Sequence, residues 1–363
     1  MYSDNLVHIW ITLLGRPANK IASLLVENYG SLREAYLVKS YTDVTCEIRN
    51  NRLLCQRLMD ESIKDRAARI YERVLEKGVK ITHVFREDYP EDLKNIFDPP
   101  FVLYYYGKLP DKNTTLLSVV GSRKCSAYGR KVTYDMCFNI AKHGVGIVSG
   151  MAKGIDARAH VGCLDANGYT IAVLGGGPDN IYPLENEVIY YRIKENGLVL
   201  SEYPPGTMPL KHHFPARNRI IAGLGKGLLV CEAGKKSGAM ITVNFAINEG
   251  RDIFSVPGNI DSSYSEGCNS LIKAGACIAT SFIDVLEGLN LIEGRKIAGT
   301  VGWLNGLDKE EAMVADLIYK GVKIEDICSK TGLDSARVVA ITTILEVKGI
   351  LGRDRHGNLH VVI

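Results

Sequence analysis

The sequence predicts an α/β fold built on a doubly wound, mostly parallel sheet, with an all-α domain before it and a winged-helix domain after it. Three observations carry this prediction. Between residues 79 and 288, short β-branched apolar runs alternate with amphipathic stretches of helical length, which is typical of a parallel sheet covered on both faces. Residues 1–78 show only helical periodicity. Residues 306–363 follow the order helix, helix, helix and hairpin.

The first 78 residues are expected to form a helical domain of the SAM-like, degenerate helix-hairpin-helix type. Apolar residues recur at helical spacing in 9–14, 21–29 and 67–74. A hairpin that grips phosphate has glycines on both sides of an apolar residue, but here Pro17 takes the second place after Gly15. Because proline has no N–H to donate, we do not expect this domain to bind phosphate.

The central region, 79–288, contains the runs that predict the sheet. The expected strands are 79–84, 101–106, 116–120, 146–149, 170–174, 197–201, 227–231 and 252–256. Helical periodicity between them places helices at 128–143, 155–167 and 239–249. This region is therefore the part of the chain in which loops at strand ends can form a site.

The C-terminal region begins with an expected linker, 289–305, which has three glycines and little periodicity. Helices are predicted at 308–320, 324–329 and 334–348, and strands at 350–353 and 359–363 around the hairpin-turn sequence 356–358. Residues 306–363 carry eight Lys/Arg and nine Asp/Glu. The expected recognition helix, 334–348, has only Arg337 and Lys348 as cations. We therefore expect this winged helix to contact protein or another copy of itself, and not to read duplex DNA.

Composition excludes several classes of protein. Hydrophobic residues make up 46% of the 363 residues, so the chain can bury a large core, and the net charge of +3 means that any polyanion site must come from local charge segregation. No stretch is apolar enough to span a bilayer, and the first residues lack the basic start of a signal peptide. The nine cysteines form no CxxC pair, so we expect no metal, no disulfide and a cytoplasmic location.

Three glycine-rich loops follow predicted strands. The first is Gly121-Ser122-Arg123, the second is Ser149-Gly150-Met151-Ala152-Lys153-Gly154-Ile155-Asp156, and the third is Gly175-Gly176-Gly177. A loop that leaves a parallel strand and enters a helix presents free backbone N–H groups to a phosphate. None has the GxxxxGK[ST] or GxGxxG spacing, so neither ATP hydrolysis nor a dinucleotide cofactor is expected.

Two segments without acidic residues lie beside these loops. They are 113–134 and 203–231, and the second contains Lys211, Arg217, Arg219 and the aromatic Phe214. Cations that follow a backbone and a ring that stacks on bases are what single-stranded nucleic acid requires. A further turn, Ser237-Gly238, follows the strand at 227–231 and can begin a helix that faces a phosphate.

An enzyme is not predicted. The sequence has no GxSxG elbow, and its eight histidines are dispersed. Asp156, Glu202 and Glu232 are expected to pair with Arg217, Arg219 or Arg251 to hold loops in place, and His160 is expected to pack against the sheet. We therefore expect no catalytic residue and no cofactor.

Many motifs in one order resemble those of the DNA-processing protein A (DprA, also called Smf) family. They include the three glycine loops, Tyr182-Pro183, Phe214-Pro215-Ala216-Arg217-Asn218-Arg219, Ser237-Gly238 and Gly267-Cys268-Asn269-Ser270-Leu271-Ile272. The resemblance implies a Rossmann-like domain and a protein, not an enzyme, that binds and shields incoming single-stranded DNA. It further implies loading of the RecA recombinase during natural transformation, and a homodimer formed through the Rossmann-like domain.

The resemblance also implies a pocket made by Ser122, Arg123, Lys153, Lys211, Phe214, Arg217 and Asn218. Together with the loops and basic segments, it gives the expected strand-binding residues, which are Gly121, Ser122, Arg123, Gly150, Met151, Lys153, Gly154, Gly176, Lys211, Phe214, Arg217, Asn218, Arg219, Ser237 and Gly238.

Two other functions stay open. A related Rossmann-like superfamily includes phosphoribohydrolases of nucleoside monophosphates, which carry a GGxGT motif followed by a glutamate. The corresponding stretch here is Glu232-Ala233-Gly234-Lys235-Lys236-Ser237-Gly238, which argues against that chemistry. The other alternative is a winged-helix regulator of duplex DNA, which the charge count of residues 306–363 opposes.

Overall fold

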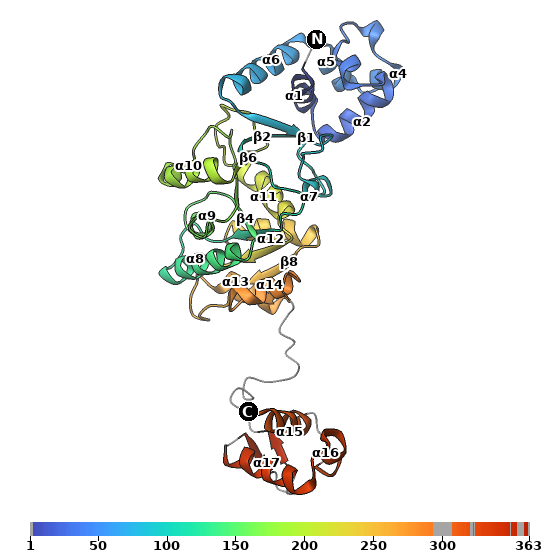
Figure 1. Cartoon of the computed structure of the whole chain (residues 1–363). Coiled ribbons are helices and arrows are strands. Elements are labelled where there is room, and N and C mark those ends of the chain that lie inside the picture. Colours follow the sequence, from blue (N-terminus) through green and yellow to red (C-terminus); the bar gives the residue numbers. More distant parts are fainter. Residues whose placement is uncertain are drawn as a thin grey trace. The chain divides into compact units, whose positions relative to one another are not determined.

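A computed structural model of the chain describes residues 3–292, 307–319, 322, 324–348, 350–353 and 359–361 (Figure 1). It divides into two compact units, Met1–Leu289 and Asn290–Ile363. Of the predicted linker, 293–305 lies outside the described residues, as does the predicted hairpin turn at 356–358. No helix in the described part of the chain is long and apolar enough to cross a membrane.

The first unit begins with helices. They are α1 Asp4–Leu14, α2 Ala18–Tyr29, α3 Leu32–Tyr36, the 3₁₀ helix Tyr41–Asp43, α4 Cys46–Arg49, α5 Arg52–Met59 and α6 Glu61–Glu76. Local capping explains two of the boundaries: Ser31 accepts a hydrogen bond from the Glu34 amide, and the Asp60 carboxylate accepts one from the Ser62 amide. The apolar face of α1, including Trp10, is fully buried. This core is continuous with one face of the sheet.

A nine-stranded sheet follows, with the order β1-β2-β6-β5-β4-β3-β7-β8-β9. The strands are β1 Lys80–His83, β2 Val102–Gly107, β3 Leu116–Val120, β4 Gly146–Ser149, β5 Thr170–Val173, β6 Leu198–Ser201, β7 Gly227–Val230, β8 Asp252–Ser255 and β9 Cys277–Ile278. The pairs β1–β2 and β2–β6 are antiparallel, and the other pairs are parallel. The predicted α/β fold with a doubly wound, mostly parallel sheet is confirmed.

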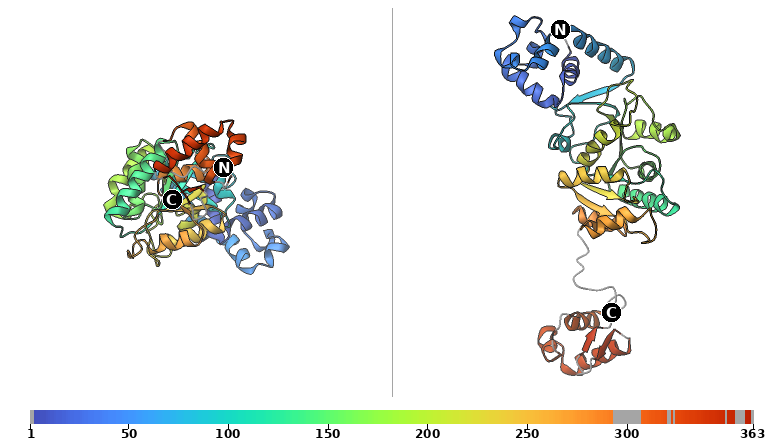
Figure 2. Two further views of the ribbon diagram at one scale, coloured as in Figure 1. Left: turned by 90° about the horizontal axis from the view of Figure 1, so that it is seen from below. Right: turned by 180° about the vertical axis from the view of Figure 1, so that it is seen from behind.

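Helices cover both faces of this sheet, as the opposite views in Figures 1 and 2 show. One face carries α8 Ala127–Lys142, α9 Ile155–Asp165 and α10 Glu187–Asn196. The other carries α7 Glu91–Lys94, α11 His213–Leu224 and α12 Ala239–Asn248. The chain continues through α13 Glu266–Lys273 and α14 Phe282–Gly288. The sheet is thus buried on both sides, which is why its central strands are continuous apolar runs.

The second unit contains α15 Lys309–Tyr319, α16 Ile324–Thr331, α17 Ser335–Val347 and an antiparallel pair, β10 Leu351–Arg353 and β11 Leu359–Val361. Both cations of the predicted recognition helix face carboxylates of α15: Arg337 lies 2.8 Å from Glu310, and Lys348 lies 2.7 Å from Glu311. These ion pairs leave the exposed part of α17 mostly apolar, with Val339 and Val347 both exposed. The winged-helix assignment and a protein-contact role for this unit stay predictions.

A buried histidine pair joins α1 to β1. The rings of His8 and His83 are stacked with their centroids 3.6 Å apart, and both residues are buried. Burial lowers the pKa of His83 to about 4, with the neighbouring His8 adding to the shift, and burial also lowers the pKa of His8. Both rings are therefore neutral in the folded protein at neutral pH.

We expect acid to destabilise the first unit through this pair. As pH falls from 6.5 towards 4, the unfolded chain binds protons that the folded chain does not, so the free energy of unfolding decreases, by about 2–3 kcal/mol for His83. Urea unfolding at about pH 7.5 and about pH 5 measures this loss. In the variant His83→Phe an aromatic ring still stacks on His8 but cannot bind a proton. The decrease in its free energy of unfolding between the two pH values should therefore be smaller. An equal loss in wild type and variant would contradict the account.

Candidate nucleic-acid interface

The sheet has a topological switch point at β3. From β3 the chain moves through β4 and β5 to β6 on one side, and then returns to β7 and β8 on the other side. At such a point the loops that leave two neighbouring parallel strands diverge, and a crevice opens beyond their carboxyl ends. Here those loops are the Gly121 loop after β3 and the loop 231–238 after β7, both predicted from the sequence to face phosphate.

The Gly121 loop is fixed by backbone contacts. A Cβ at Gly121 would lie 2.7 Å from the Glu232 carbonyl oxygen, so only glycine fits there. The Ser122 amide donates to that same carbonyl at 2.7 Å, and the Ser122 carbonyl accepts from the Ile155 amide at 3.2 Å. The Glu232 carboxylate accepts from the Ser126 amide and hydroxyl at 2.7 and 2.6 Å. Glu232 thus holds a loop, as predicted, but through Ser126 and not through an arginine.

The loop after β4 is held by Arg217. This guanidinium is buried, and its Nη1 donates to the carbonyl oxygens of Gly150, at 2.7 Å, and Val173. It ties the ends of β4 and β5 to α11 and lies close to the buried Asp156. Burial lowers the pKa of Arg217 to about 10, so the side chain stays charged, while burial raises the pKa of Asp156 against the opposing effect of that charge.

Gly154 sets the distance between the two loops. Its φ is +82°, and a Cβ there would lie 2.6 Å from the Arg123 carbonyl oxygen. We expect Gly154→Ala to push the Ser122-Arg123 backbone away and to lower the free energy of unfolding by about 1–3 kcal/mol. Chemical denaturation measures that loss. Gly144, also at positive φ (+80°) but with no atom within 4 Å of its Cβ position, provides the control Gly144→Ala. If both variants lose the same free energy of unfolding, crowding against Arg123 does not contribute to the loss of stability.

The third glycine loop supports an aromatic ring. A Cβ at Gly175 would lie 3.0 Å from the Phe214 ring, so the glycine lets that ring lie flat against the backbone. The half-buried ring has the Arg123 guanidinium carbon 5.4 Å and the Tyr182 ring 5.6 Å from its centroid. Phe214 is therefore partly exposed and bordered by a cation, which is the environment of a base-stacking residue.

These loops enclose a groove of about 1040 Å³. Its lining includes the expected residues Gly121, Ser122, Arg123, Lys211, Phe214, Arg217, Asn218, Ser237 and Gly238. Six cations and two carboxylates line it; they are Arg123, Lys124, Lys211, Arg217, Lys235 and Lys236, with Asp156 and Glu266. Within the described residues, the exposed Arg123, Lys211, Lys235 and Lys236 form no ion pair. The groove is consequently electropositive and open to a polyanion.

Six expected residues do not line this groove. Gly150 and Gly176 shape the loops: a Cβ at Gly150 would lie 2.7 Å from the Arg217 guanidinium, and one at Gly176 would lie 2.9 Å from the Thr207 carbonyl oxygen. Met151 is buried in the core at a positive φ of 57°. Lys153 pairs with Glu185 at the surface. The other two are Gly154, described above, and Arg219.

Arg219 belongs to an ion-pair cluster beneath the groove. Its buried guanidinium donates to Glu202 at 2.7 Å and to Asp98 at 3.1 Å. Arg16, in the hairpin between α1 and α2, lies 3.5 Å from the same Glu202 carboxylate. The prediction that Glu202 pairs with one of the arginines to hold a loop is confirmed. His160 is likewise buried against the sheet, 2.8 Å from the Thr170 hydroxyl, as predicted.

Two tyrosines line the groove that were not among the residues expected from the sequence. Tyr182 lies in the turn before α10, and Tyr264 lies in the loop between β8 and α13; both are about half exposed. Tyr182 stands among the family motifs, but nothing marked it as a neighbour of Phe214. Tyr264 could have been suspected because its loop leaves the carboxyl end of a parallel strand next to β7.

The lining residues of the groove include no histidine or cysteine, and the buried Asp156 lies close to Arg217. Among the described residues, no group of three or more His, Cys, Asp or Glu side chains is placed to hold a metal ion. The chemistry that this arrangement supports is binding of phosphates and stacking of bases.

The chain is similar to a known protein family and to solved structures. Residues 80–290 match the family model described as DNA recombination-mediator protein A. The DNA processing protein DprA of Streptococcus pneumoniae is 49% identical over 198 residues, which are 54% of this chain and 70% of that protein. An X-ray structure of that organism's DNA processing protein A covers 79% of this chain and 98% of its own, with a TM-score of 0.65 and 37% identity.

A second solved structure is DNA processing protein A from Helicobacter pylori, described for its single-stranded DNA binding mode. It matches 58% of this chain and 96% of its own, with a TM-score of 0.52 and 29% identity. The similarity thus covers the sheet, its helices and the loops that form the groove.

Proposed function

This chain belongs to the DNA recombination-mediator protein A family, and we propose that it binds single-stranded DNA without sequence preference. The observation that carries the proposal is the groove at the switch point, where Arg123 lies over the partly exposed Phe214 ring and Lys211, Lys235 and Lys236 line the same groove. Every base has a face that can stack, and every nucleotide has a phosphate, so this combination holds a strand regardless of sequence. The Helicobacter pylori relative, described as binding single-stranded DNA, supports the same assignment.

Replacing Phe214 tests the stacking role. We expect Phe214→Ala to weaken binding of a labelled oligo-dT by about 1–3 kcal/mol, the contribution of one stacked base. Phe214→Trp, which keeps an aromatic face, should retain most of the affinity. Fluorescence anisotropy measures both. Phe138, an aromatic residue of α8 away from the groove, provides the control Phe138→Ala. Equal affinities of Phe214→Ala and wild type would exclude stacking on this ring.

The proposed cellular role is to protect incoming single strands in the cytoplasm and to load the RecA recombinase on them during natural transformation and recombination. We further propose that the protein acts as a homodimer through its Rossmann-like domain and without catalysis. Filament assembly by RecA on strands already coated with single-strand-binding protein tests the loading role. Assembly should accelerate when this protein is added, and an unchanged rate would contradict loading. Sedimentation of the protein alone tests the dimer.

The alternative, hydrolysis of nucleoside monophosphates, is tested by incubation with each monophosphate and chromatography for released base. We expect none to be released, because residues 232–238 lack the GGxGT motif with its following glutamate, and the lining carboxyl of Asp156 lies close to Arg217. Release of base at a rate that depends on Asp156 would replace the binding proposal with an enzymatic one.

A further inference from the structure

A second hollow, of about 420 Å³, lies beside the groove between the first turns of α8 and α9 and the start of α10. Four exposed cations line it: Arg123, Lys124, Arg130 and Arg158. Val161 and Ile189 provide apolar surface. No carboxylate appears among its described lining residues.

The charges of this hollow are not neutralised by neighbouring side chains. Arg130 donates an N–H to the Cys125 carbonyl at 2.8 Å, which orients its guanidinium, and it forms no ion pair with a described residue. In the described part of the chain, Arg158 forms no ion pair or hydrogen bond through its side chain. Glu185, next in sequence to the lining residue Asn186, is occupied by Lys153. The cations repel one another, and a bound anion relieves that repulsion.

The positions of Arg130 and Arg158 on their helices also favour a bound anion. Arg130 and Arg158 are each the fourth residue of their helix, α8 and α9. The N-terminal end of a helix carries partial positive charge, so cations are unfavourable there and anions are favourable. The ends of both helices and the two arginines therefore favour a negatively charged ligand between them.

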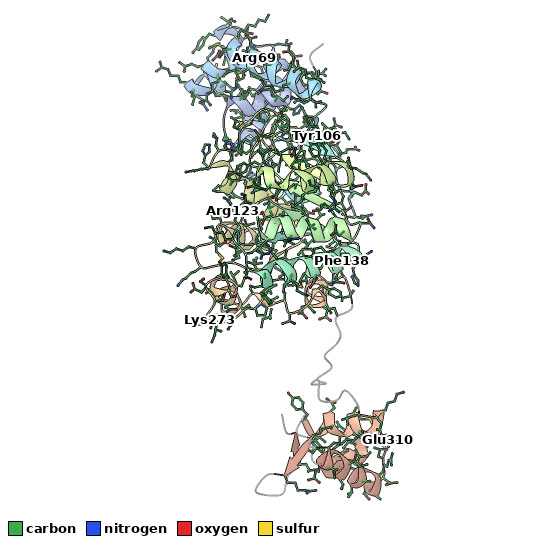
Figure 3. The ribbon with its side chains drawn as sticks, turned by 90° about the vertical axis from the view of Figure 1, so that its left-hand side faces the viewer. Arg69, Tyr106, Arg123, Phe138, Lys273 and Glu310 are labelled. Atoms are coloured by element: carbon green, nitrogen blue, oxygen red, sulfur yellow. The ribbon has the colours of Figure 1, made fainter. Side chains whose placement is uncertain are left out.

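The hollow adjoins the groove, because Arg123 and Lys124 line both. Figure 3 shows Arg123 and Phe138 towards opposite ends of the helices on this face, so the hollow lies at the Arg123 end of α8. A chain of phosphates that passes Arg123 therefore meets Arg130 and Arg158 next.

We propose that the hollow continues the path of the bound DNA strand, with Arg130 and Arg158 on phosphates beyond the nucleotides held in the groove. This inference rests on the proposed function and extends it. One protein molecule then covers more nucleotides than the groove alone holds. Only strands that are long enough to extend beyond Arg123 reach the additional contacts. A strand confined to the groove does not reach them.

Comparing a short and a long strand distinguishes specific contacts in the hollow from general electrostatic attraction. The double variant Arg130→Ala/Arg158→Ala is compared with wild type on labelled oligo-dT of about 6 and about 20 nucleotides. The variant should bind the long strand roughly fivefold to tenfold more weakly, and the slope of log K against log salt should lose about 1.4, that is, about 0.7 for each phosphate contact. Binding of the short strand should change by less than about twofold.

Lys142, the last residue of α8 and exposed, provides the control. Lys142→Ala should bind both strands like wild type, and thermal unfolding should show that every variant is folded. If the double variant weakens both strands equally, or neither, while wild type binds both, the strand does not continue through this hollow. If wild type binds neither strand, the proposed function itself fails, and the inference fails with it.

Discussion

Replacing Arg217 with alanine is expected to destabilise the first unit by about 3–5 kcal/mol, because a buried guanidinium that is bonded to buried groups is lost. The buried guanidinium donates to the carbonyl oxygens of Gly150 and Val173 and lies close to Asp156. Its loss leaves two buried carbonyl acceptors without this donor and removes the positive charge near the buried Asp156 carboxyl. Urea unfolding measures the loss, and DNA binding should fall with it because the loop after β4 is no longer held.

A double-mutant cycle checks the cause. Asp156→Ala introduced into the Arg217→Ala protein removes the orphaned carboxyl, so the double variant should lose less stability than the sum of the two single variants. Arg217→Lys should recover little, because a single ammonium cannot donate in the planar geometry of the guanidinium. Additive losses would show that Arg217 and Asp156 do not stabilise one another.

Arg123→Ala is expected to weaken single-stranded DNA binding by about 3 kcal/mol, roughly a hundredfold, and to leave the folded state unchanged. Arg123 is exposed, forms no ion pair with the described residues, lies over the Phe214 ring and lines both the groove and the adjoining hollow. It is therefore placed to bind a phosphate while the neighbouring base stacks. Anisotropy with oligo-dT measures the affinity.

Two comparisons test whether the loss of affinity comes from the guanidinium and not from a loss of stability. Arg123→Lys keeps the charge but loses the paired donors, so it should recover only part of the affinity. The stability of Arg123→Ala should equal that of wild type in urea, in contrast to Arg217→Ala. An affinity within twofold of wild type would remove Arg123 from the proposed site.

Much of the sheet could be predicted because its strands are buried on both faces. Continuous β-branched runs such as 116–120 and 146–149 coincide with β3 and β4, and the other predicted strands agree to within one residue at each end. The two-residue strand Cys277–Ile278 was missed because so short a run has no periodicity. Helix α11 was not predicted either: its first turn is His213-Phe214-Pro215, and no side chain caps it.

The parts of the site that are formed by backbone loops could be predicted from the sequence. The directions in which its side chains point could not. The glycines that follow parallel strands indicated Gly121, which lines the groove, and Gly175, which lies against the Phe214 ring. Counting charges along 203–231 could not distinguish Lys211, which is exposed, from Arg217 and Arg219, which are buried. Only the fold shows that these two arginines, two residues apart on α11, are held by carbonyl and carboxylate groups from other segments.

The central claim is that the groove holds a single strand through its phosphates and bases, and one titration tests it most directly. Binding of a labelled oligo-dT and of a duplex of equal length is measured at several salt concentrations. We expect the single strand to bind more tightly throughout, with a slope of log K against log salt of about −0.7 for each phosphate contact. A preference for duplex, or affinity for the single strand that does not change with salt, would contradict the claim.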